Sequence, residues 1–323
     1  MYILKFNPIY KTTLWGGNRL ATHKNADNSL DNIAESWEIS GVDGNETTVA
    51  NGEYKGLTVT ELVSRLKGEL LGKSVYEQFG NSFPLLIKFI DAAKDLSIQV
   101  HPGDEMARRE HGKSGKTEMW YVVDATEEAT ILAGLKKKIT PEEYKQKVAD
   151  KSICDAVSRY KATAGDVFYI PSGRIHSIGA GCLVAEIQQT SDVTYRIYDF
   201  DRRDKNGNLR ELHTELAAQA IDYNVCDDYR THYAETTDGC TEIIDSKYFK
   251  TSLISLTKDF AKDYSGLDSF VILMCVEGGA TLTAPDGESI DINAYETVLV
   301  PAAMKEIKFQ PKAGKAKFVE THL

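Results

Sequence analysis

Four side chains of types that bind metal ions fall in three short segments of the 323-residue chain. Gln99 and His101 stand two residues apart in LSIQVHPGDE, a spacing that on a strand points both side chains to the same face. Glu118 stands in KTEMWY, and His176 stands in PSGRIH just past a Pro-x-Gly corner. One carboxylate, two imidazoles and an amide carbonyl suit a divalent first-row metal. The set favours one zinc ion per chain, because zinc accepts such ligands in flexible geometry.

Each of these residues also has an ordinary structural explanation. A single histidine at a strand end is more often a core or capped residue than a ligand, and an isolated glutamate is usually a surface charge. The metal interpretation therefore depends on the combination of Q-x-H-P with G-x5-P-x-G-x2-H. The other histidines occur in no comparable pattern, and we expect them to be structural or exposed: His23, His111, His213, His232 and His322.

The overall composition is typical of a globular protein and argues against some kinds of partner. Hydrophobic residues make up 42% and charged residues 27%, an ordinary globular mixture. The net charge of −10 argues against a nucleic acid or an anionic membrane as partner, but a local basic pocket could still bind a small anion. The five cysteines are odd in number and widely spaced, and no segment has the length of a membrane span. We expect a cytoplasmic protein.

The elements that position these residues are mostly strands. Short runs rich in β-branched and aromatic residues are separated by Gly, Pro and Asp turns, which is typical of sandwiches and jelly-roll barrels. Helices are few. We expect four of them: 58–70 and 140–150, each begun by a Thr-x-x-Glu capping box, 214–224 with Thr214 as N-cap, and a short one within 103–112.

Two segments far apart in the chain share one pattern. Residues 165–176 and 294–306 each combine an acidic residue, a hydrophobic strand and a proline at its end. Only the first places a histidine five residues after the proline, whereas the second has Glu306 there. A polar stretch at 235–245 separates the two copies. We therefore predict a catalytic, metal-binding domain with helical insertions over 1–240 and a C-terminal β domain without metal ligands over 241–323.

The spacing of Gly165, Pro171, Gly173 and His176 is that of the second cupin motif. The whole chain resembles the type I mannose-6-phosphate isomerases in their short bacterial form. The matching segments follow in order: LWGG (14–17), ESWEIS (35–40), PLLIKFIDAAKDLSIQVHP (84–102), GKTEMWYV (115–122), IPSGRIHSIG (170–179) and EIQQTSDVTYRIYD (186–199). Most cupins have histidine where Gln99 stands, and a glutamate closer to the second histidine. The isomerase family shares both departures, so the resemblance is to that family.

The resemblance implies two cupin-type jelly-roll β-barrel domains with a few peripheral helices. It also implies reversible conversion of mannose 6-phosphate to fructose 6-phosphate through an enediol or enediolate. The residues that it assigns are zinc ligands Gln99, His101, Glu118 and His176, catalytic Arg196, Glu186 and Lys116, and substrate-binding Lys88 and Ser97.

Three of these assignments can be weighed from the residues alone. Lys88 lies in the apolar run LLIKFI, an awkward place for a charge unless it points into a pocket. Arg196 has a structural alternative, an ion pair with Asp199 or Asp192. Glu186 is a candidate general base, alongside a metal-bound hydroxide or a histidine.

Two rival functions remain open on the sequence. Two histidines and a carboxylate can hold iron in a cupin oxygenase. Alternatively, a cupin can bind a sugar without turnover. The sequence leaves open whether the chain is a monomer or a homodimer, and whether its product serves mannose catabolism or glycan precursors such as GDP-mannose.

Overall fold

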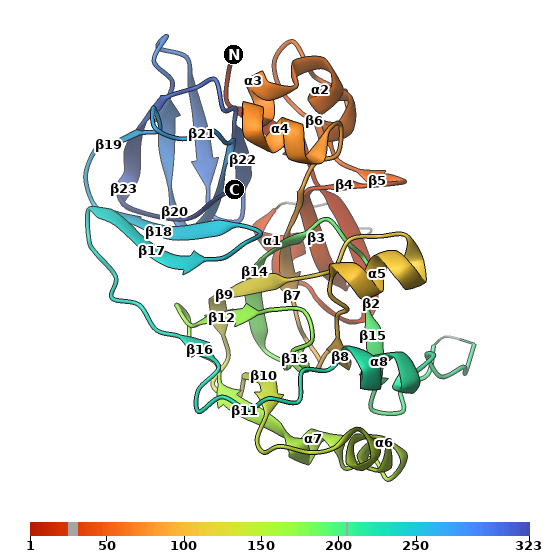
Figure 1. Cartoon of the computed structure of the whole chain (residues 1–323). Helices are drawn as coiled ribbons and strands as arrows, with labels where there is room; N and C mark the ends of the chain where they lie inside the picture. Colours follow the sequence, from red (N-terminus) through yellow and green to blue (C-terminus); the bar gives the residue numbers. More distant parts are fainter. Residues whose placement is uncertain (25–31, 205) are drawn as a thin grey trace.

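The structure, a computed structural model, describes residues 1–24, 32–204 and 206–323. It is mainly β, as expected, and its strands form three large sheets and one two-stranded sheet of β4 (Gly41–Val42) and β5 (Asn45–Glu46) (Figure 1). Within the described part of the chain, no helix combines the length and the apolar character that a membrane crossing needs.

Two of the large sheets belong to the N-terminal part and enclose one hydrophobic core. The seven-stranded sheet has the order β16 (Arg230–Thr231), β12 (Val167–Ile170), β9 (Glu118–Ala125), β14 (Cys182–Gln189), β7 (Leu85–Asp91), β3 (Ile33–Ile39), β2 (Ile9–Gly17). The five-stranded sheet has the order β11 (Val157–Lys161), β10 (Thr130–Leu135), β13 (His176–Ile178), β8 (Ile98–Val100), β15 (Tyr195–Tyr198). Side chains of both sheets, among them Trp120, Val184 and Ile131, share the core between them.

The third large sheet contains most of the C-terminal strands. Its path runs β17 (Gly239–Asp245), β18 (Lys250–Leu256), β23 (Glu306–His322), β20 (Val271–Thr283), β22 (Thr297–Val300), β1 (Leu4–Asn7), β6 (Thr48–Val49), with β19 (Phe260–Asp263) on β23 and β21 (Ser289–Asn293) on β20. The first strand of the chain therefore belongs to this sheet, with Leu4 paired to Leu299. The division near residue 240 stays a prediction, and β1 lies across it.

The helices agree with the sequence at two positions and differ at two others. α5 (Asp104–His111) and α6 (Pro141–Ala149) form as expected, and Thr140 makes both hydrogen bonds of its capping box. The helix expected over 58–70 is broken, because Lys67 has a φ of 50° and ends α2 (Val59–Leu66) before α3 (Gly68–Leu71). Thr214 is the first residue of α8 (Thr214–Ala220) and not its cap, which is His213.

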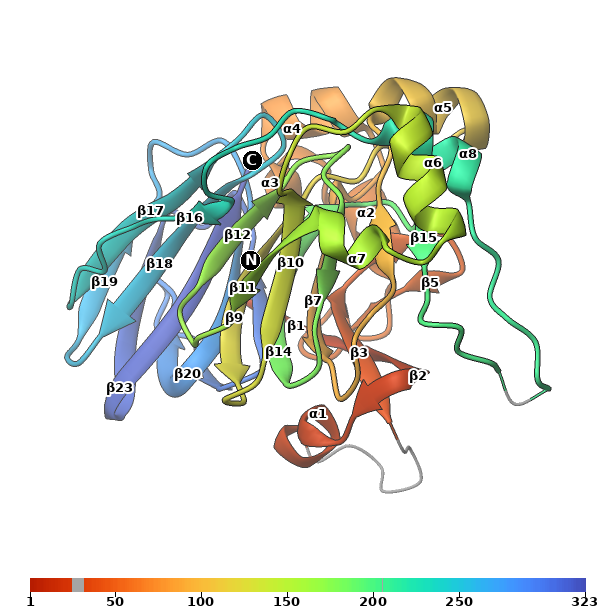
Figure 2. The same ribbon diagram turned by 90° about the horizontal axis from the view of Figure 1, so that it is seen from below.

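Three further helices were not expected from the sequence: α1 (Arg19–His23), α4 (Lys73–Phe79) and α7 (Ile153–Ala156). Figure 2 shows α2 to α5 and α8 gathered at one end of the strands and α1 at the other.

Alternation along the strands separates the core from the polar side chains of the site. On β14, Leu183, Ala185 and Ile187 pack in the core shared with the C-terminal sheet. Glu186 lies on the opposite face, because successive strand residues point to opposite sides. Its cross-strand partners are Lys88 on β7 and Trp120 on β9. The register of these three central strands thus brings polar groups from distant segments to one face.

The N-cap of α6 gives a direct test of this local structure. Replacing Thr140 with Ala should lower the free energy of unfolding by about 1 kcal/mol, because the backbone N–H of Glu143 loses its acceptor. Thr140→Ser is the matched control, since it keeps the hydroxyl. Urea denaturation of both variants measures the difference, and equal midpoints would contradict the role of the cap.

Candidate active site

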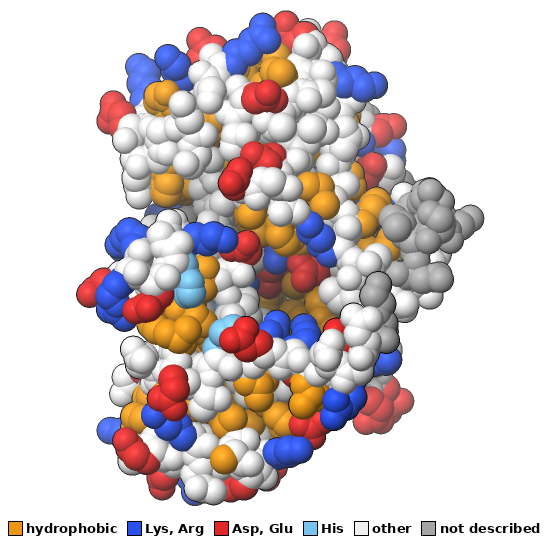
Figure 3. Space-filling model, turned by 90° about the vertical axis from the view of Figure 1, so that its right-hand side faces the viewer, with side chains coloured by type: hydrophobic (Ala, Val, Ile, Leu, Met, Phe, Trp, Pro, Cys, Tyr) orange, Lys and Arg blue, Asp and Glu red, His pale blue; other side chains and the backbone are white. Residues whose placement is uncertain are grey.

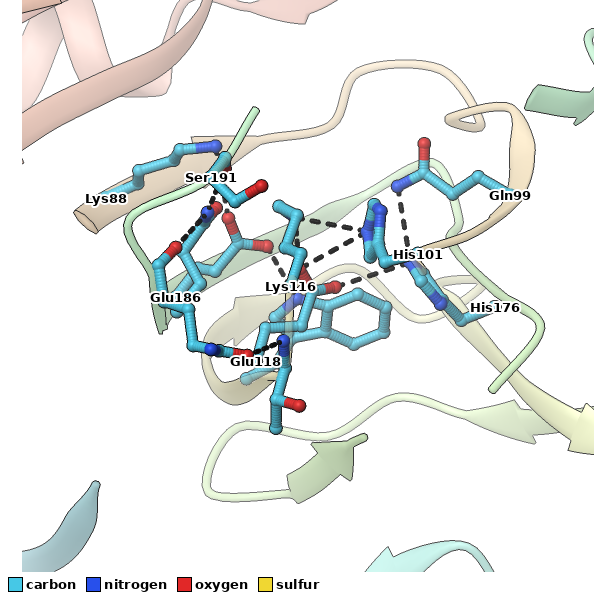
Figure 4. A network of polar contacts seen from close by, with 12 residues as sticks. Lys88, Gln99, His101, Lys116, Glu118, His176, Glu186 and Ser191 are labelled. Atoms are coloured by element: carbon cyan, nitrogen blue, oxygen red, sulfur yellow. Dashed lines mark hydrogen bonds and ion pairs between the residues drawn. The ribbon is translucent and has the colours of Figure 1, made fainter. Parts of the chain in front are cut away.

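The centre of the site is a group of three buried residues, His101, Glu118 and His176 (Figure 4). One ligand atom from each lies within 4.8 Å of the others. Nε2 of His101 is 3.4 Å from Oε2 of Glu118, and Nε2 of His176 is 3.3 Å from Oε1. His176 comes from β13, Glu118 from the start of β9, and His101 follows β8 directly. Strands of both N-terminal sheets therefore converge here.

Backbone carbonyls orient both imidazoles. Nδ1 of His101 lies 3.0 Å from the carbonyl oxygen of Val193, and Nδ1 of His176 lies 2.7 Å from that of Arg174. Each Nδ1–H can donate to its carbonyl, which leaves the Nε2 lone pair directed at Glu118. Burial lowers the pKa of His101 to about 4, with the Lys116 ammonium acting in the same direction. Burial also lowers the pKa of His176. Both rings are thus neutral near pH 7.

The Glu118 carboxylate is ionised and incompletely satisfied. Burial alone would raise its pKa, but Lys116, His101 and His176 together outweigh burial and hold the pKa well below the usual value. Lys116 pairs with Oε2, whereas Oε1 is buried without a hydrogen-bond partner. Two imidazole nitrogens and a carboxylate therefore face one another, an arrangement that needs positive charge beside it. Lys116 supplies part of that charge, because its ammonium also lies 3.1 Å from Nε2 of His101. The donor set fits a divalent metal ion.

Gln99 lies beside this group. The backbone of Gln99 is paired with that of His176, and the amide nitrogen of Gln99 is 3.3 Å from Nε2 of the His176 ring. A half-turn of the amide exchanges nitrogen for the carbonyl oxygen, since the two are sterically alike. The structure thus brings all four sequence-predicted ligands together, with Gln99 at the edge of the buried three.

A second polar cluster lies on the inner face of the seven-stranded sheet. The ammonium of Lys88 is 3.1 Å from a carboxylate oxygen of Glu35 and 3.2 Å from Oε1 of Glu186. Trp37 donates to Glu35 and Trp120 donates to Oε2 of Glu186. Burial would lower the pKa of Lys88, but the two carboxylates raise it above its usual value. The lysine is therefore charged and shared between two anions.

Arg196 does not make the ion pair that the sequence left open. Among the residues that the structure describes, no carboxylate lies within 4.0 Å of its guanidinium, and Asp199 instead pairs with Arg202 and Arg210. Arg196 donates to the carbonyl of Glu211 at 3.1 Å. Its backbone pairs with that of Gln99 across β15 and β8.

These residues line or underlie one cavity of about 350 Å³. Figure 3 shows a hollow on this face of the molecule with basic and acidic side chains in its depth. The sequence-predicted residues on its wall are Lys88, Ser97, Gln99, Lys116, Glu186 and Arg196. His101, Glu118 and His176 are buried beneath it. All nine predicted residues thus belong to one region.

Among the residues of the cavity wall that sequence reasoning missed are Glu35, Trp37, Arg210 and His213. Glu35 and Trp37 had a signal, since their spacing of two residues places both side chains on one face of a strand. His213 had no such signal. We expected it to be structural or exposed, and that expectation did not include a place on the cavity wall. His213 accepts the backbone N–H of Arg196 and also lies on the cavity wall.

Comparisons with known proteins agree on one family. A profile described as "Phosphomannose isomerase type I, catalytic domain" matches residues 3–157. The chain is 34% identical over 324 residues to "Mannose-6-phosphate isomerase ManA" of Bacillus subtilis, which covers 99% of this chain and 98% of that protein. It is 42% identical over 213 residues to a mannose-6-phosphate isomerase of Streptococcus mutans, over 65% of this chain and 63% of that protein.

Solved structures give the same result. The crystal structure of the mannose 6-phosphate isomerase from Bacillus subtilis matches with a TM-score of 0.89 and 30% identity, and it covers 100% of both chains. The phosphomannose isomerase from Salmonella typhimurium in its apo form matches with a TM-score of 0.80 over 100% of this chain and 99% of that chain. At 14% identity, this second match shows the fold alone.

The metal-binding role of His101, Glu118 and His176 can be tested by measuring the metal content of variants. Glu118→Gln should reduce bound divalent metal from one ion per chain to near zero, because it removes the only carboxylate of the group. Glu186→Gln is the matched control, since it removes a buried carboxylate of the same cavity outside the group. Atomic emission after dialysis measures the metal content. Equal metal content in the two variants would contradict the assignment.

The Lys88 cluster predicts a pH dependence. Burial would raise the pKa of Glu35, but Lys88 and Trp37 outweigh it and hold the pKa below its usual value. A carboxylate with a lowered pKa stabilises the fold above its unfolded pKa, near 4.5, and this contribution is lost as the pH falls through the folded value. At pH 7, Glu35→Gln should therefore cost about 1.5–3 kcal/mol.

The difference between Glu35→Gln and wild type should shrink as the pH falls below about 4.5. Chemical denaturation at several pH values measures it. Glu127→Gln, at an exposed position, serves as control and should show no such trend. A loss of stability that is the same at pH 7 and pH 3.5 would refute the linkage.

Proposed function

The chain belongs to the family of type I phosphomannose isomerases, and from that premise we propose that it interconverts mannose 6-phosphate and fructose 6-phosphate with zinc as cofactor. The observation that carries the proposal is the buried His-Glu-His group directly beneath a cavity lined by acidic and basic side chains. Such a cavity offers an electrophilic centre, a base and anion-binding groups within the reach of one small molecule.

Zinc suits the donor set. Two neutral imidazole nitrogens and a carboxylate, with the amide oxygen of Gln99 beside them, are nitrogen and oxygen ligands that zinc accepts. When bound, zinc would polarise a sugar oxygen and stabilise negative charge on it. Lys116 would contribute in the same sense, because its buried ammonium lies at the border of the group and the cavity.

Aldose–ketose isomerisation moves one proton between C1 and C2 of the open-chain sugar. The C2–H bond breaks, and its electron pair forms the C1–C2 double bond of the enediolate while the C1 carbonyl pair moves to O1. The carbon-bound proton then returns at C1, and the O2 proton passes to O1 as the C2 carbonyl forms. The reaction is redox-neutral and needs no nucleotide. We assign the proton transfer to Glu186, which lies on the cavity wall and whose Oε1 accepts no hydrogen bond.

The neighbours of Glu186 support this role. The N–H of Trp120 holds its Oε2 at 2.8 Å, which leaves Oε1 as the oxygen that can receive a proton. Lys88 lies 3.2 Å from Oε1 and keeps the carboxylate oriented in the cavity. The ammonium of Lys88 is in turn tied to Glu35, which limits its movement.

Two further expectations are carried as proposals. Residues 1–240 would hold the catalytic metal site and 241–323 a β domain without one. In the described part of the chain, His101, Glu118 and His176 make up the only metal-type group, which supports this division. The five cysteines are free, which is consistent with the reducing cytoplasm as location.

The proposed function and the assignment of Glu186 as the base can be tested separately. Zinc-loaded wild type should interconvert the two sugar phosphates and, in heavy water, should incorporate deuterium into the product. Glu186→Gln should lower kcat by about 10²–10⁴-fold while keeping its metal. A coupled assay and mass spectrometry of the product measure both effects. Folded, zinc-loaded wild type without activity would refute the function, and an active Glu186→Gln variant would refute the assigned base.

A further inference from the structure

The charges of the cavity are distributed unevenly. Lys88 is balanced by two carboxylates, Glu35 and Glu186, and Lys116 is balanced by Glu118. The remaining cations on the wall are Arg196 and Arg210. The lysine part of the cavity thus has two cations against three carboxylates, whereas the arginine part is cationic.

Arg196 makes no ion pair within 4.0 Å among the residues that the structure describes. Its Nε is buried without a hydrogen-bond partner, and its one side-chain hydrogen bond goes to a backbone carbonyl. Burial lowers the pKa of Arg196, and the nearby guanidinium of Arg210 acts in the same direction. Two like charges are therefore held close together in a partly desolvated place, which favours an anionic ligand.

Arg210 is held in this place by Asp199. Its Nε donates to Oδ2 of Asp199 at 2.7 Å, and its Nη2 contacts Oδ1. Asp199 is buried and also pairs with Arg202. Two guanidiniums thus share one carboxylate, and Arg196 lies close to Arg210 without pairing with Asp199, so this corner keeps an excess of positive charge. Of the two arginines that Asp199 binds, only Arg210 lines the cavity.

The position of the arginines fits the shape of a sugar phosphate. Strand order places β13, with His176, next to β8, with Gln99, and β8 next to β15, with Arg196. Two interstrand spacings correspond to about 10 Å. The phosphate of a hexose 6-phosphate lies at the opposite end of the carbon chain from C1 and C2. An anion site at β15, two strands from His176 and on the far side of Gln99, would therefore receive it.

We propose that Arg210, which follows β15 in the segment 199–213, binds the phosphate of the substrate together with Arg196, and that Asp199 is the positioning residue for Arg210. This inference rests on the proposed function and names the substrate contact that selects phosphorylated sugars. Lys88 is the weaker candidate for this role, because its charge is already neutralised by two carboxylates.

The test compares three variants: Arg210→Gln, Arg210→Lys and the control Arg202→Gln. Arg202 pairs with the same carboxylate but does not line the cavity. The measurements are kcat and KM for mannose 6-phosphate and the competitive inhibition constant of inorganic phosphate, a probe of the anion site alone. Thermal unfolding of each variant reports on folding.

Arg210→Gln should raise both KM and the phosphate inhibition constant by roughly 10- to 100-fold, the range for a lost charge-assisted contact. Arg210→Lys should raise them by less, since lysine cannot form the bidentate contact. Arg202→Gln should change neither. If Arg210→Gln does not fold, Arg210→Lys decides, and an unchanged phosphate inhibition constant overturns the proposal.

Asp199→Asn tests the positioning role. It should weaken phosphate inhibition in the wild-type background and add nothing in the Arg210→Gln background, because both changes act on one contact. Additive losses would overturn the positioning role. Wild type that is active but indifferent to phosphate would overturn the phosphate site and leave the isomerase function standing. Wild type that does not turn over mannose 6-phosphate refutes the function itself.

Discussion

The rest of the site depends on the burial of the Glu118 carboxylate. Removing an ionised carboxylate from water costs several kcal/mol unless charges and hydrogen bonds replace the water. Here Lys116 forms an ion pair with Oε2, whereas Oε1 faces the unprotonated nitrogen of His176 without a hydrogen bond. The carbonyls that face the Nδ1 atoms turn Nε2 of both imidazoles toward the carboxylate, and the Lys116 ammonium lies 3.1 Å from Nε2 of His101. These acceptors need positive charge beside them, which Lys116 supplies to Oε2 and to Nε2 of His101 while Oε1 has no hydrogen-bond partner, and that requirement defines the site.

The fold meets this requirement through strand alternation. The central strands of the seven-stranded sheet bury apolar side chains on the face toward the C-terminal sheet, and present Lys88, Glu118, Trp120 and Glu186 on the other. Because the apolar face is packed between two sheets, a slip of one residue would bury the charges in the core. The hydrophobic core therefore fixes the register, and the register fixes which charges meet. The polar side chains meet in one arrangement because the apolar core tolerates only one strand register.

Features encoded by short-range spacing could be predicted from the sequence. The shared face of Gln99 and His101 and the capping box at Thr140 are of this kind, and the resemblance to a family supplied Arg196 and Glu186. Features decided by tertiary packing could not. A positive φ at Lys67 divides a helix whose apolar spacing runs on without interruption. The pairing of β1 with the C-terminal sheet is a contact over nearly 300 residues. Arg210 was missed because an arginine in a polar loop has no local signal.

The C-terminal sheet shows that a buried carboxylate alone does not make a metal site. Glu320 is nearly as buried as Glu118, with 2% of its surface exposed. Its oxygens are fully engaged, one by the ammonium of Lys262 and the other by the hydroxyl of Tyr264 at 2.5 Å. No imidazole lone pair faces it in the described residues, so no further cation is demanded. The two carboxylates are thus distinguished by what surrounds them. Both oxygens of Glu320 have partners, whereas Oε1 of Glu118 has no hydrogen-bond partner and lies beside an imidazole nitrogen. This is the physical difference between a structural ion pair and a centre that can bind a metal.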